Sequence, residues 1–361
     1  MIKLLIFTTE LDYGGAEKFI LRLTKELLNY DIKISICCIA RKTEIINYQL
    51  DKKIKLLELQ TSLKKSLPKI IRTINFEKPN IVFSILWPLN SIVAIAKIFS
   101  KHNFKLILRD GNPYIPKAAS DFKLPLFLIK LIVSFTYFLS DQIISISKGN
   151  ANNLNKFSLI DLRKKNKVIY NFVDTNRVIN INQKDNKLIS ILALGKFRPQ
   201  KDFETIIYSM NELKKYINFK LHIVGDGPKR KSLEELVDKL HLNKCIIFYG
   251  IKDNIYELID QSDFFIHSSH YDGLPNAVLE AMNSKIKIIA TDCNYGPREI
   301  LDNGKYGKLV KVGDFKQISQ EIINNININI NYEDRKKWIK KFSIENITKN
   351  YYETILQVFN K

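Results

Sequence analysis

The chain has 361 residues, of which 45% are hydrophobic and 26% are charged; this composition excludes intrinsic disorder and suits two domains that each have a core. Its net charge of +20 is uneven, because residues 1–180 contain 29 Lys and Arg against 14 Asp and Glu, whereas residues 181–361 contain 28 against 23. Such an excess favours an anionic partner: nucleic acid, a membrane surface or a phosphorylated substrate. Part of it reflects a chain that is rich in Ile, Lys and Asn throughout.

The beginning of the chain, Met1 to Thr9, is a short apolar run without a basic leader or a cleavage site, so we expect a first strand and a cytoplasmic protein. The two longest apolar stretches, 81–96 and 124–139, are too short to span a bilayer, and no transmembrane helix is predicted. The cysteines have neither the spacing of zinc ligands nor that of a disulfide framework, and we expect them buried and reduced: Cys37, Cys38, Cys245 and Cys293.

Strand-like and helical segments alternate along the first half of the chain. The predicted strands are 3–7, 32–39, 81–85, 104–108, 142–146 and 168–170. The predicted helices are 15–28, 63–75, 89–99, 122–139 and a segment from Lys148. Apolar β-branched runs that are separated by helices predict a parallel sheet covered on both faces.

The same alternation restarts after a polar stretch. The predicted strands are 188–194, 220–224, 245–248, 264–266 and 286–290, and the predicted helices are 203–215, 230–240, a segment from Pro275, and 333–361. We therefore predict an α/β protein with two doubly wound, Rossmann-like domains that face a cleft, joined by a linker near 172–187. Open sheets of this kind bind ligands at the carboxyl ends of their strands.

A turn rich in glycine or lysine follows the first strand of each half. In Gly14-Gly15-Ala16-Glu17 the glycines would let backbone amides approach a phosphate, or would only tighten the turn. Lys196 and Lys201 follow the strand that ends at Leu194. They could neutralise a departing diphosphate, or could be ordinary solvated lysines of a Lys-rich chain.

Two other turns are less specific. Val224-Gly225-Asp226-Gly227-Pro228 matches a dinucleotide fingerprint only in part, because no third glycine follows, so we interpret it as structural with one possible ligand contact at Gly227. Arg109-Asp110-Gly111-Asn112 follows the strand that ends at Leu108. Arg109 and Asn112 could hold an acceptor or a phosphate, or the Arg-Asp pair could simply close a turn.

The most informative segment is 271–282, in which Asp272 and Glu280 lie on either side of a turn that opens a helix. Gly273 permits close approach of the backbone to a ligand, and Pro275 suits the first helical position. The amides that could point at an anion belong to Leu274, Asn276 and Ala277.

The helix in this segment also carries a polar stripe, because Asn276, Glu280 and Asn283 have a spacing of i, i+4 and i+7. The stripe could bind hydroxyl groups, or it could be the solvated face of an apolar helix. His270 is the one histidine expected near it, whereas His267 lies in a strand and is expected in the core. With no Asp-x-Asp motif and no His/Cys cluster, we expect neither a metal nor another cofactor.

In their order and spacing, these motifs and Thr291–Ile300 resemble the family 4 retaining glycosyltransferases over nearly the whole chain. The segment 272–280 is similar to the family's Glu-x7-Glu signature. The resemblance implies a GT-B fold, with an acceptor-binding domain (1–175), a nucleotide-sugar-binding domain (176–343) and a last helix (344–361) that crosses back to the first domain.

The resemblance also implies roles for single residues. Glu280 would bind the ribose, Asp272 would lie near the donor sugar, and Lys196 and Lys201 would bind the diphosphate and act in catalysis together with Asp272. The other implied donor contacts are Gly15, Gly227, Gly273, Leu274, Pro275 and Asn276, and the implied acceptor contacts are Gly14, Arg109 and Asn112. Retention of the anomeric configuration would need no strong side-chain base, because a leaving-group oxygen would take the acceptor proton.

Three positions depart from the family pattern. Asp272 replaces the commoner Glu, and Lys196 stands where Arg is frequent, which keeps the charge but loses a bidentate fork. No histidine follows the strand that ends at Leu108, where some relatives place one near the acceptor. We expect the first change to remodel the contact with the donor sugar.

The resulting hypothesis is a metal-independent hexosyltransferase of bacterial surface polysaccharide synthesis, such as capsule or O-antigen synthesis. It would move a hexose or N-acetylhexosamine from a UDP-linked sugar to a lipid-linked saccharide, at the inner face of the plasma membrane and without nucleic acid. Its basic first half and the helix 122–139 would attach it peripherally to anionic lipids. The alternatives are a non-catalytic basic protein that binds lipid or nucleic acid, and a nucleotide-sugar epimerase on the same fold.

Overall fold

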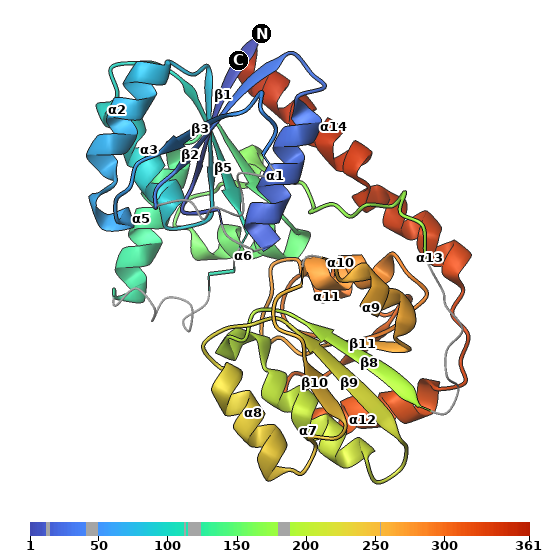
Figure 1. Ribbon diagram of the computed structural model, residues 1–361. Helices are drawn as coiled ribbons and strands as arrows, with labels where there is room; N and C mark the ends of the chain where they lie inside the picture. The colour runs from blue at the N-terminus through green and yellow to red at the C-terminus, as the bar shows by residue number, and fades with distance from the viewer. Residues whose placement is uncertain (12–14, 41–49, 112, 115–123, 180–187, 253) are drawn as a thin grey trace. The chain divides into compact units, whose positions relative to one another are not determined.

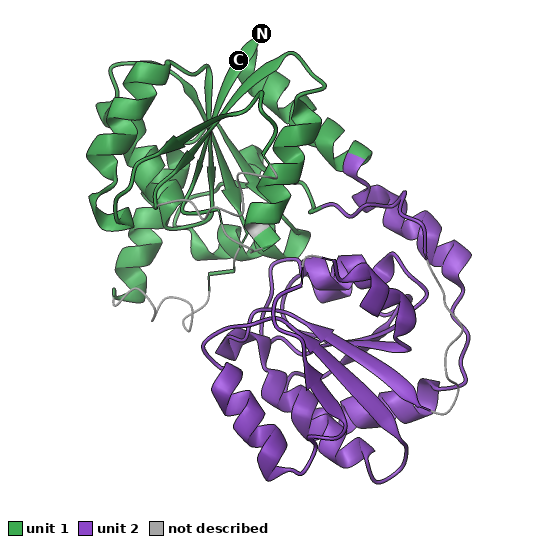
Figure 2. Ribbon diagram, viewed as in Figure 1, with its two compact units in different colours: residues 1–171, 345–361 green, residues 172–344 purple. Residues whose placement is uncertain are grey.

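The computed structural model describes residues 1–361 except 12–14, 41–49, 112, 115–123, 180–187 and 253 (Figure 1). The chain divides into two compact units, one made of residues 1–171 and 345–361 and the other of residues 172–344 (Figure 2). Almost all of the last helix, α14 (Ile344–Phe359), therefore belongs to the first unit.

The first unit is built on a seven-stranded sheet in the order β3-β2-β1-β4-β5-β6-β7, in which all neighbours are parallel. The strands are β1 (Ile2–Thr8), β2 (Ile32–Cys38), β3 (Lys55–Glu58), β4 (Ile81–Ile85), β5 (Lys105–Asp110), β6 (Gln142–Ser145) and β7 (Asn166–Val168). Its other helices are α1 (Gly15–Leu27), α2 (Leu67–Glu77), α3 (Leu89–Phe99), α5 (Leu126–Phe138) and α6 (Lys148–Phe157). Helices α2 and α3 cover one face of the sheet, and α1 and α14 cover the other (Figure 1).

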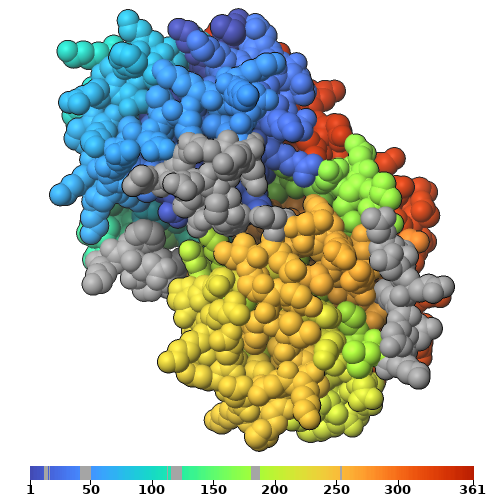
Figure 3. All heavy atoms as spheres, viewed as in Figure 1, coloured from blue at the N-terminus to red at the C-terminus, as the bar shows by residue number. Residues whose placement is uncertain are grey.

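The second unit repeats this winding in a six-stranded parallel sheet in the order β10-β9-β8-β11-β12-β13. The strands are β8 (Ile189–Leu194), β9 (Phe219–Val224), β10 (Ile246–Phe248), β11 (Phe264–His267), β12 (Lys287–Thr291) and β13 (Lys308–Val310). The helices are α7 (Phe203–Leu213), α8 (Arg230–Lys239), α9 (Tyr256–Gln261), α10 (Asn276–Met282), α11 (Pro297–Ile300), α12 (Phe315–Asn325) and α13 (Tyr332–Ile339). Residues near 230–280, coloured yellow to orange, form most of the face of this unit that is turned to the viewer in Figure 3.

Burial on both faces explains why the central strands are continuous apolar runs. All five residues of β4 and all four of β11 are buried, as parallel strands between two helical layers must be. The helices contribute one apolar stripe each; α7, for example, buries Phe203, Ile207 and Met210 against its sheet. Side-chain caps start several helices, such as Asp202, which accepts a hydrogen bond from the amide of Thr205. The predicted fold class of two doubly wound, Rossmann-like domains is confirmed.

Several predicted boundaries were wrong. Residues 333–361 form two helices, α13 and α14, because the chain becomes extended at Ser343, where Val173 donates a backbone hydrogen bond to the carbonyl of Phe342. The short strands β3 and β13 were missed, since three or four partly exposed residues give little periodicity. Helix α5 begins at Leu126 rather than at Phe122, which lies outside the described residues. In the described part of the chain, no helix combines the length and hydropathy needed to cross a bilayer.

Candidate functional site

Four loops meet at the carboxyl edge of the second sheet. They follow β8, β9, β11 and β12, and parallel strands bring their carboxyl ends to the same edge. The loops are Gly195–Lys201, Gly225–Pro228, Ser268–Pro275 and the segment that begins at Asp292. The second-unit residues to which the sequence assigned a donor or catalytic role all lie on three of these loops or on α10.

The loop after β9 packs directly against the loop after β8. A Cβ atom on Gly225 would lie 1.9 Å from the carbonyl oxygen of Gly195, and one on Gly227 would lie 2.8 Å from the backbone nitrogen of Phe197. The amide of Phe197 donates a hydrogen bond of 2.9 Å to the carbonyl of Asp226. Both glycines are therefore needed for contact between the two loops, as the structural interpretation of this turn proposed.

Hydrogen bonds also tie the loop after β8 to the loop after β11. The amide of His270 donates to the carbonyl of Gln200 at 2.9 Å, and Gln200 Nε2 donates to the carbonyl of Tyr271 at 2.7 Å. Ser268 Oγ donates to the carbonyl of Lys201 at 2.8 Å. These three bonds hold Lys201 beside the segment that carries Asp272.

Lys201 and Asp272 form an ion pair, with 2.5 Å between Nζ and Oδ2, although they are 71 residues apart in the sequence. Both side chains remain partly exposed, at 24% and 14%. Lys196 is half-buried five residues earlier and has no ion-pair partner among the described residues. The loops after β8 and β11 thus bring a lysine paired with a carboxylate to this edge, and the first of them also carries Lys196.

His267 lies beneath this ion pair at the end of β11, with Nε2 3.6 Å from Asp272 Oδ2. Burial, with a smaller contribution from the charge of Lys201, lowers its pKa to about 4 against the opposing effect of Asp272. The imidazole is therefore neutral at pH 7, and its Nε2 has no hydrogen-bond partner in the structure. The expectation that His267 belongs to the core describes its burial but missed its contact with Asp272.

Cys293, in the loop after β12, is a second buried group whose pKa is affected by the charge of Asp272. Burial and the Asp272 carboxylate raise the pKa of its thiol to about 12. The thiol therefore stays protonated and unreactive at neutral pH. Nothing in the sequence placed Cys293 near Asp272, since the two residues lie on loops after different strands.

Helix α10 begins one residue later than predicted: Pro275 is its N-cap residue, and Asn276 is its first helical residue. Asn276 and Glu280 are half-buried on this helix, whereas Gly273 and Leu274 are buried in the turn before it. Asn283 does not continue the polar stripe towards a ligand, because it is buried and its Nδ2 donates to the carbonyl of Asp174.

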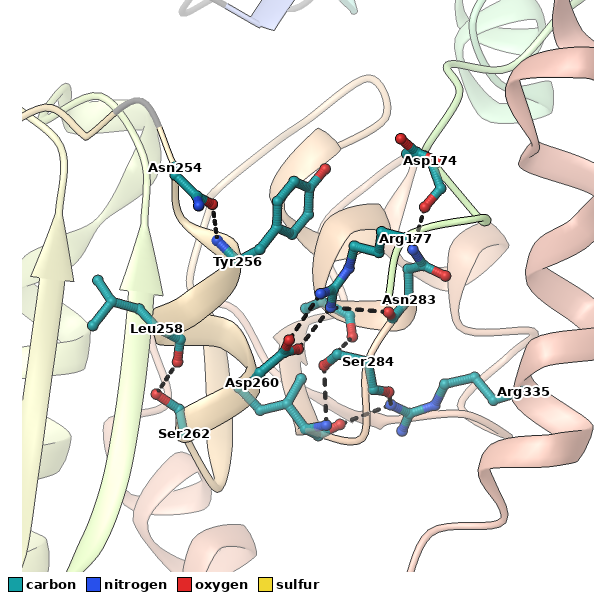
Figure 4. A network of polar contacts seen from close by, with 12 residues as sticks. Asp174, Arg177, Asn254, Tyr256, Leu258, Asp260, Ser262, Asn283, Ser284 and Arg335 are labelled. Carbon is teal, nitrogen blue, oxygen red and sulfur yellow. Dashed lines mark hydrogen bonds and ion pairs between the residues drawn. The ribbon is translucent and has the colours of Figure 1, made fainter. Parts of the chain in front are cut away.

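A polar network fixes the far end of α10 (Figure 4). Arg177 makes a bidentate ion pair with Asp260, at 2.9 and 2.7 Å, and also donates to the carbonyl of Asn283 at 3.1 Å. Its guanidinium lies 4.5 Å from the centre of the Tyr256 ring. The segment after residue 172 thus holds α10 in place, which gives Glu280 a rigid support.

Of the three residues for which an acceptor contact was implied, the structure describes only Arg109. Arg109 was expected to contact an acceptor, but its side chain is 2% exposed. Its Nε donates to the hydroxyl of Tyr351 at 3.0 Å, its Nη2 donates to Asn171 Oδ1, and its guanidinium lies 4.2 Å from the centre of the Phe19 ring. Arg109 therefore holds α14 to the sheet, because Tyr351 belongs to that helix. Gly14 and Asn112 lie outside the described residues, and Gly15 is the exposed first residue of α1.

Asp110, the last residue of β5, was considered in the sequence only as the partner of Arg109 in closing a turn. Its carboxyl is buried and accepts long hydrogen bonds from the hydroxyls of Tyr114, at 3.3 Å, and Tyr137, at 3.4 Å. Burial raises its pKa to about 7, although these hydrogen bonds oppose the rise. Within the part of the chain that the structure describes, no group of three or more His, Cys, Asp or Glu side chains could hold a metal ion.

Comparison with known proteins finds a family model that matches the second unit. Residues 174–342 match the family model described as glycosyl transferases group 1. An uncharacterized glycosyltransferase, MJ1059, of Methanocaldococcus jannaschii is 29% identical over 67% of this chain and 66% of its own length. The N-acetylgalactosamine-N,N'-diacetylbacillosaminyl-diphospho-undecaprenol 4-alpha-N-acetylgalactosaminyltransferase of Campylobacter jejuni is 25% identical over 89% of each chain.

Solved structures share the fold over the full length. The crystal structure of Anabaena HepE in complex with UDP superposes with a TM-score of 0.80 and 16% identity, covering 99% of this chain and 100% of that one. At this identity the likeness shows the fold alone, which is that of GT-B glycosyltransferases. Residues 174–342 thus match the glycosyl transferases group 1 model within a chain of GT-B fold, and this match together with the named relatives supports a role for the chain as a glycosyltransferase.

Proposed function

We propose that the chain is a retaining, metal-independent glycosyltransferase of family 4. It would transfer a hexose or N-acetylhexosamine from a UDP-linked sugar to a lipid-linked saccharide in bacterial surface polysaccharide synthesis. The observation that carries the proposal is the ion pair between Lys201 and Asp272 at the carboxyl edge of the second sheet, within the residues that match the group 1 model. The Campylobacter jejuni relative supports the choice of acceptor by its name, and the HepE complex supports the choice of UDP.

In this mechanism the two lysines stabilise the leaving diphosphate. The bond between the anomeric carbon and the diphosphate oxygen breaks, and the acceptor hydroxyl forms the new bond on the same face and gives its proton to the departing oxygen. Negative charge grows on the diphosphate during this step, and fixed cations stabilise it. Lys196 has no competing partner among the described residues, and the diphosphate would replace Asp272 as the partner of Lys201.

The neighbouring residues would bind the rest of the donor. Glu280 would accept hydrogen bonds from the ribose hydroxyls, supported by the network that holds α10. When Lys201 binds the diphosphate, it no longer pairs with Asp272. The protonated ring nitrogen of neutral His267 would then donate a hydrogen bond to the Asp272 carboxylate in its place. The carboxylate of Asp272 would then remain oriented towards the donor sugar.

We also propose that the protein is cytoplasmic and attaches to the inner face of the plasma membrane through α5. Ile129, Val133 and Tyr137 bury one side of this helix against the first unit. The other side exposes six large apolar side chains, here called the α5 apolar face: Phe127, Leu128, Leu131, Ile132, Phe135 and Phe138. A continuous exposed patch of this kind, on the more basic half of the chain, suits the boundary of an anionic bilayer.

The experiment that tests the function uses the purified chain, a panel of UDP-sugars and a lipid-diphosphate saccharide extract. We expect one sugar to be transferred, with retained anomeric configuration by NMR and with undiminished rate in EDTA. Glu280→Ala should weaken UDP binding about tenfold or more, whereas Glu235→Ala on α8 should leave it unchanged. Interconversion of UDP-sugars without an acceptor would instead indicate an epimerase, and absence of UDP binding would leave a non-catalytic protein.

A further inference from the structure

A cavity of about 230 Å³ lies at the opposite edge of the second sheet from Lys201 and Asp272. It is formed at the amino ends of β11, β12 and β13, where Phe264, Lys287 and Lys308 begin these strands. Lys201 and Asp272, by contrast, lie beyond the carboxyl ends of the strands. The cavity is therefore separate from the proposed donor site, although both are built on β11 and β12.

The lining of this cavity is cationic. Four basic residues line it, Lys287, Lys305, Lys308 and Arg335, and the described lining residues include no Asp or Glu. Lys305 pairs with Asp334 at 2.8 Å outside the lining, whereas exposed Lys308 has no ion-pair partner among the described residues. Lys287 donates to the carbonyl of Ile326. Asp334 therefore balances the charge of Lys305, whereas the described residues supply no ion-pair partner for Lys308 or Arg335.

Arg335 is the buried cation of this cavity, since it is only 1% exposed. Its guanidinium donates to three carbonyls, those of Ser284 at 3.1 Å, Ile286 at 2.7 Å and Tyr306 at 3.1 Å. Its Nε has no acceptor, and no carboxylate pairs with it in the described part of the chain. A buried charge without a counter-ion is unfavourable, and an anion beside it relieves the cost. Burial lowers the pKa of Arg335 to about 10, in keeping with this absence of an anionic partner.

We propose that this cavity binds a small phosphate monoester. Lys308 and Arg335, which have no ion-pair partner among the described residues, match the two charges of a dianion, and lysine and arginine are the usual protein partners of phosphate oxygens. The volume is below the roughly 300–1,000 Å³ of pockets that hold drug-sized ligands, so it suits a phosphate with a short organic group rather than a nucleotide sugar.

Occupancy of the cavity would act on the proposed donor site through Arg335. The carbonyls that Arg335 holds, those of Ser284 and Ile286, belong to the segment between α10 and β12. An anion that stabilises Arg335 would order this segment and so the end of the helix that carries Glu280. Binding at the two sites would be coupled, and by linkage the coupling would be the same in both directions.

The test is calorimetric titration of the full chain with glycerol 1-phosphate, inorganic phosphate and, as the uncharged counterpart, glycerol. Each titration is repeated with saturating UDP and with Lys196→Gln, so that phosphate binding at the donor site is recognised separately. We expect saturable binding of the monoester and none of glycerol. Lys308→Gln should raise its Kd about five- to tenfold, and Lys308→Glu should abolish it. Lys239→Gln, an exposed lysine on α8, is the matched control and should change nothing.

Hydrogen exchange gives a second readout that does not depend on glycosyl transfer. Bound monoester should slow exchange of the amides of 284–288 and leave those of β9 unchanged. The proposal is overturned if no monoester binds, if Lys308→Glu binds it as tightly as the native chain does, or if Lys196→Gln alone removes binding. Tighter binding of inorganic phosphate than of the monoester would leave an anion site but overturn the ligand class.

Discussion

Lys201 Nζ lies 2.5 Å from Asp272 Oδ2, so the lysine expected to hold a diphosphate is paired, in the ligand-free chain, with the carboxylate expected to face the donor sugar. The pair joins the loop after β8 to the loop after β11. It also sits against the neutral ring of His267. In the proposed function, this pairing would keep both side chains in place until the diphosphate competes for the lysine.

Lys201→Met tests this pair directly. We expect kcat to fall about 10²- to 10³-fold, the range found when one group that stabilises developing negative charge is removed. The two positions should also be coupled in stability. Lys201→Met leaves the Asp272 carboxylate half-buried and unpaired, and this cost disappears when Asp272→Asn is added. The double variant should therefore lose about 1 kcal/mol less unfolding free energy than the sum of the two single variants. Urea unfolding and initial rates measure the two effects, with Lys239→Met as the control. Additive stability losses in the double variant would contradict the coupling.

His267 predicts how stability depends on pH. Its pKa is about 4 in the folded chain against 6.5 for an unperturbed histidine, so the unfolded state binds more protons between these values. Stability therefore rises with pH across this window and is lost on acidification, by about 2 kcal/mol between pH 7 and pH 5 from this group. Asp110 acts in the opposite sense, since its pKa is raised to about 7. The measurement is thus the difference in unfolding free energy between the native chain and His267→Asn at each pH, and a difference that does not change with pH would refute the assignment.

The α5 apolar face predicts attachment to vesicles. Phe127→Ser combined with Phe135→Ser should weaken binding to anionic vesicles about ten- to a hundredfold, because two large apolar side chains no longer enter the bilayer boundary. Phe76→Ser is the control, since Phe76 is also exposed but lies on α2. Flotation at low and high salt measures the binding. Membrane attachment through the α5 apolar face would be ruled out if both variants lost vesicle binding equally. It would also be ruled out if neither the native chain nor the control floated with the vesicles.

Gly225→Ala tests the packing of the two loops. The added Cβ would meet the carbonyl oxygen of Gly195 at 1.9 Å, so the loop after β8 must shift. We expect a loss of about 3 kcal/mol or more in unfolding free energy, together with weaker UDP binding. Gly313→Ala is the matched control: Gly313 has φ +77°, but nothing lies within 4 Å of its Cβ position, so only about 1 kcal/mol of backbone strain is added. Equal losses in the two variants would show that backbone conformation, not loop contact, is what matters.

Periodicity in the sequence predicted most strands of both sheets. Short, β-branched runs such as Ile81–Ile85 favour strands buried on two faces, and their alternation with helices implies a parallel, doubly wound order. The same order places the residues after strand ends at one edge, so Lys196, Lys201 and Asp272 could be assigned to one region without coordinates. Short edge strands such as β13 were not predicted, because three residues are too few to show a recognisable periodicity.

The sequence by itself thus determined the fold class and the edge at which the site lies, because periodicity and turn residues act over short stretches of chain. Only the tertiary structure decided which side chains meet. Arg109 shows this most clearly: its position after a strand suggested an acceptor contact, yet it hydrogen-bonds to Tyr351, 242 residues away, inside the core. The pairing of Lys201 with Asp272 was equally undetermined, since it depends on how the loops after two strands pack together. Such contacts follow from the packing of segments distant in sequence, which no local pattern encodes.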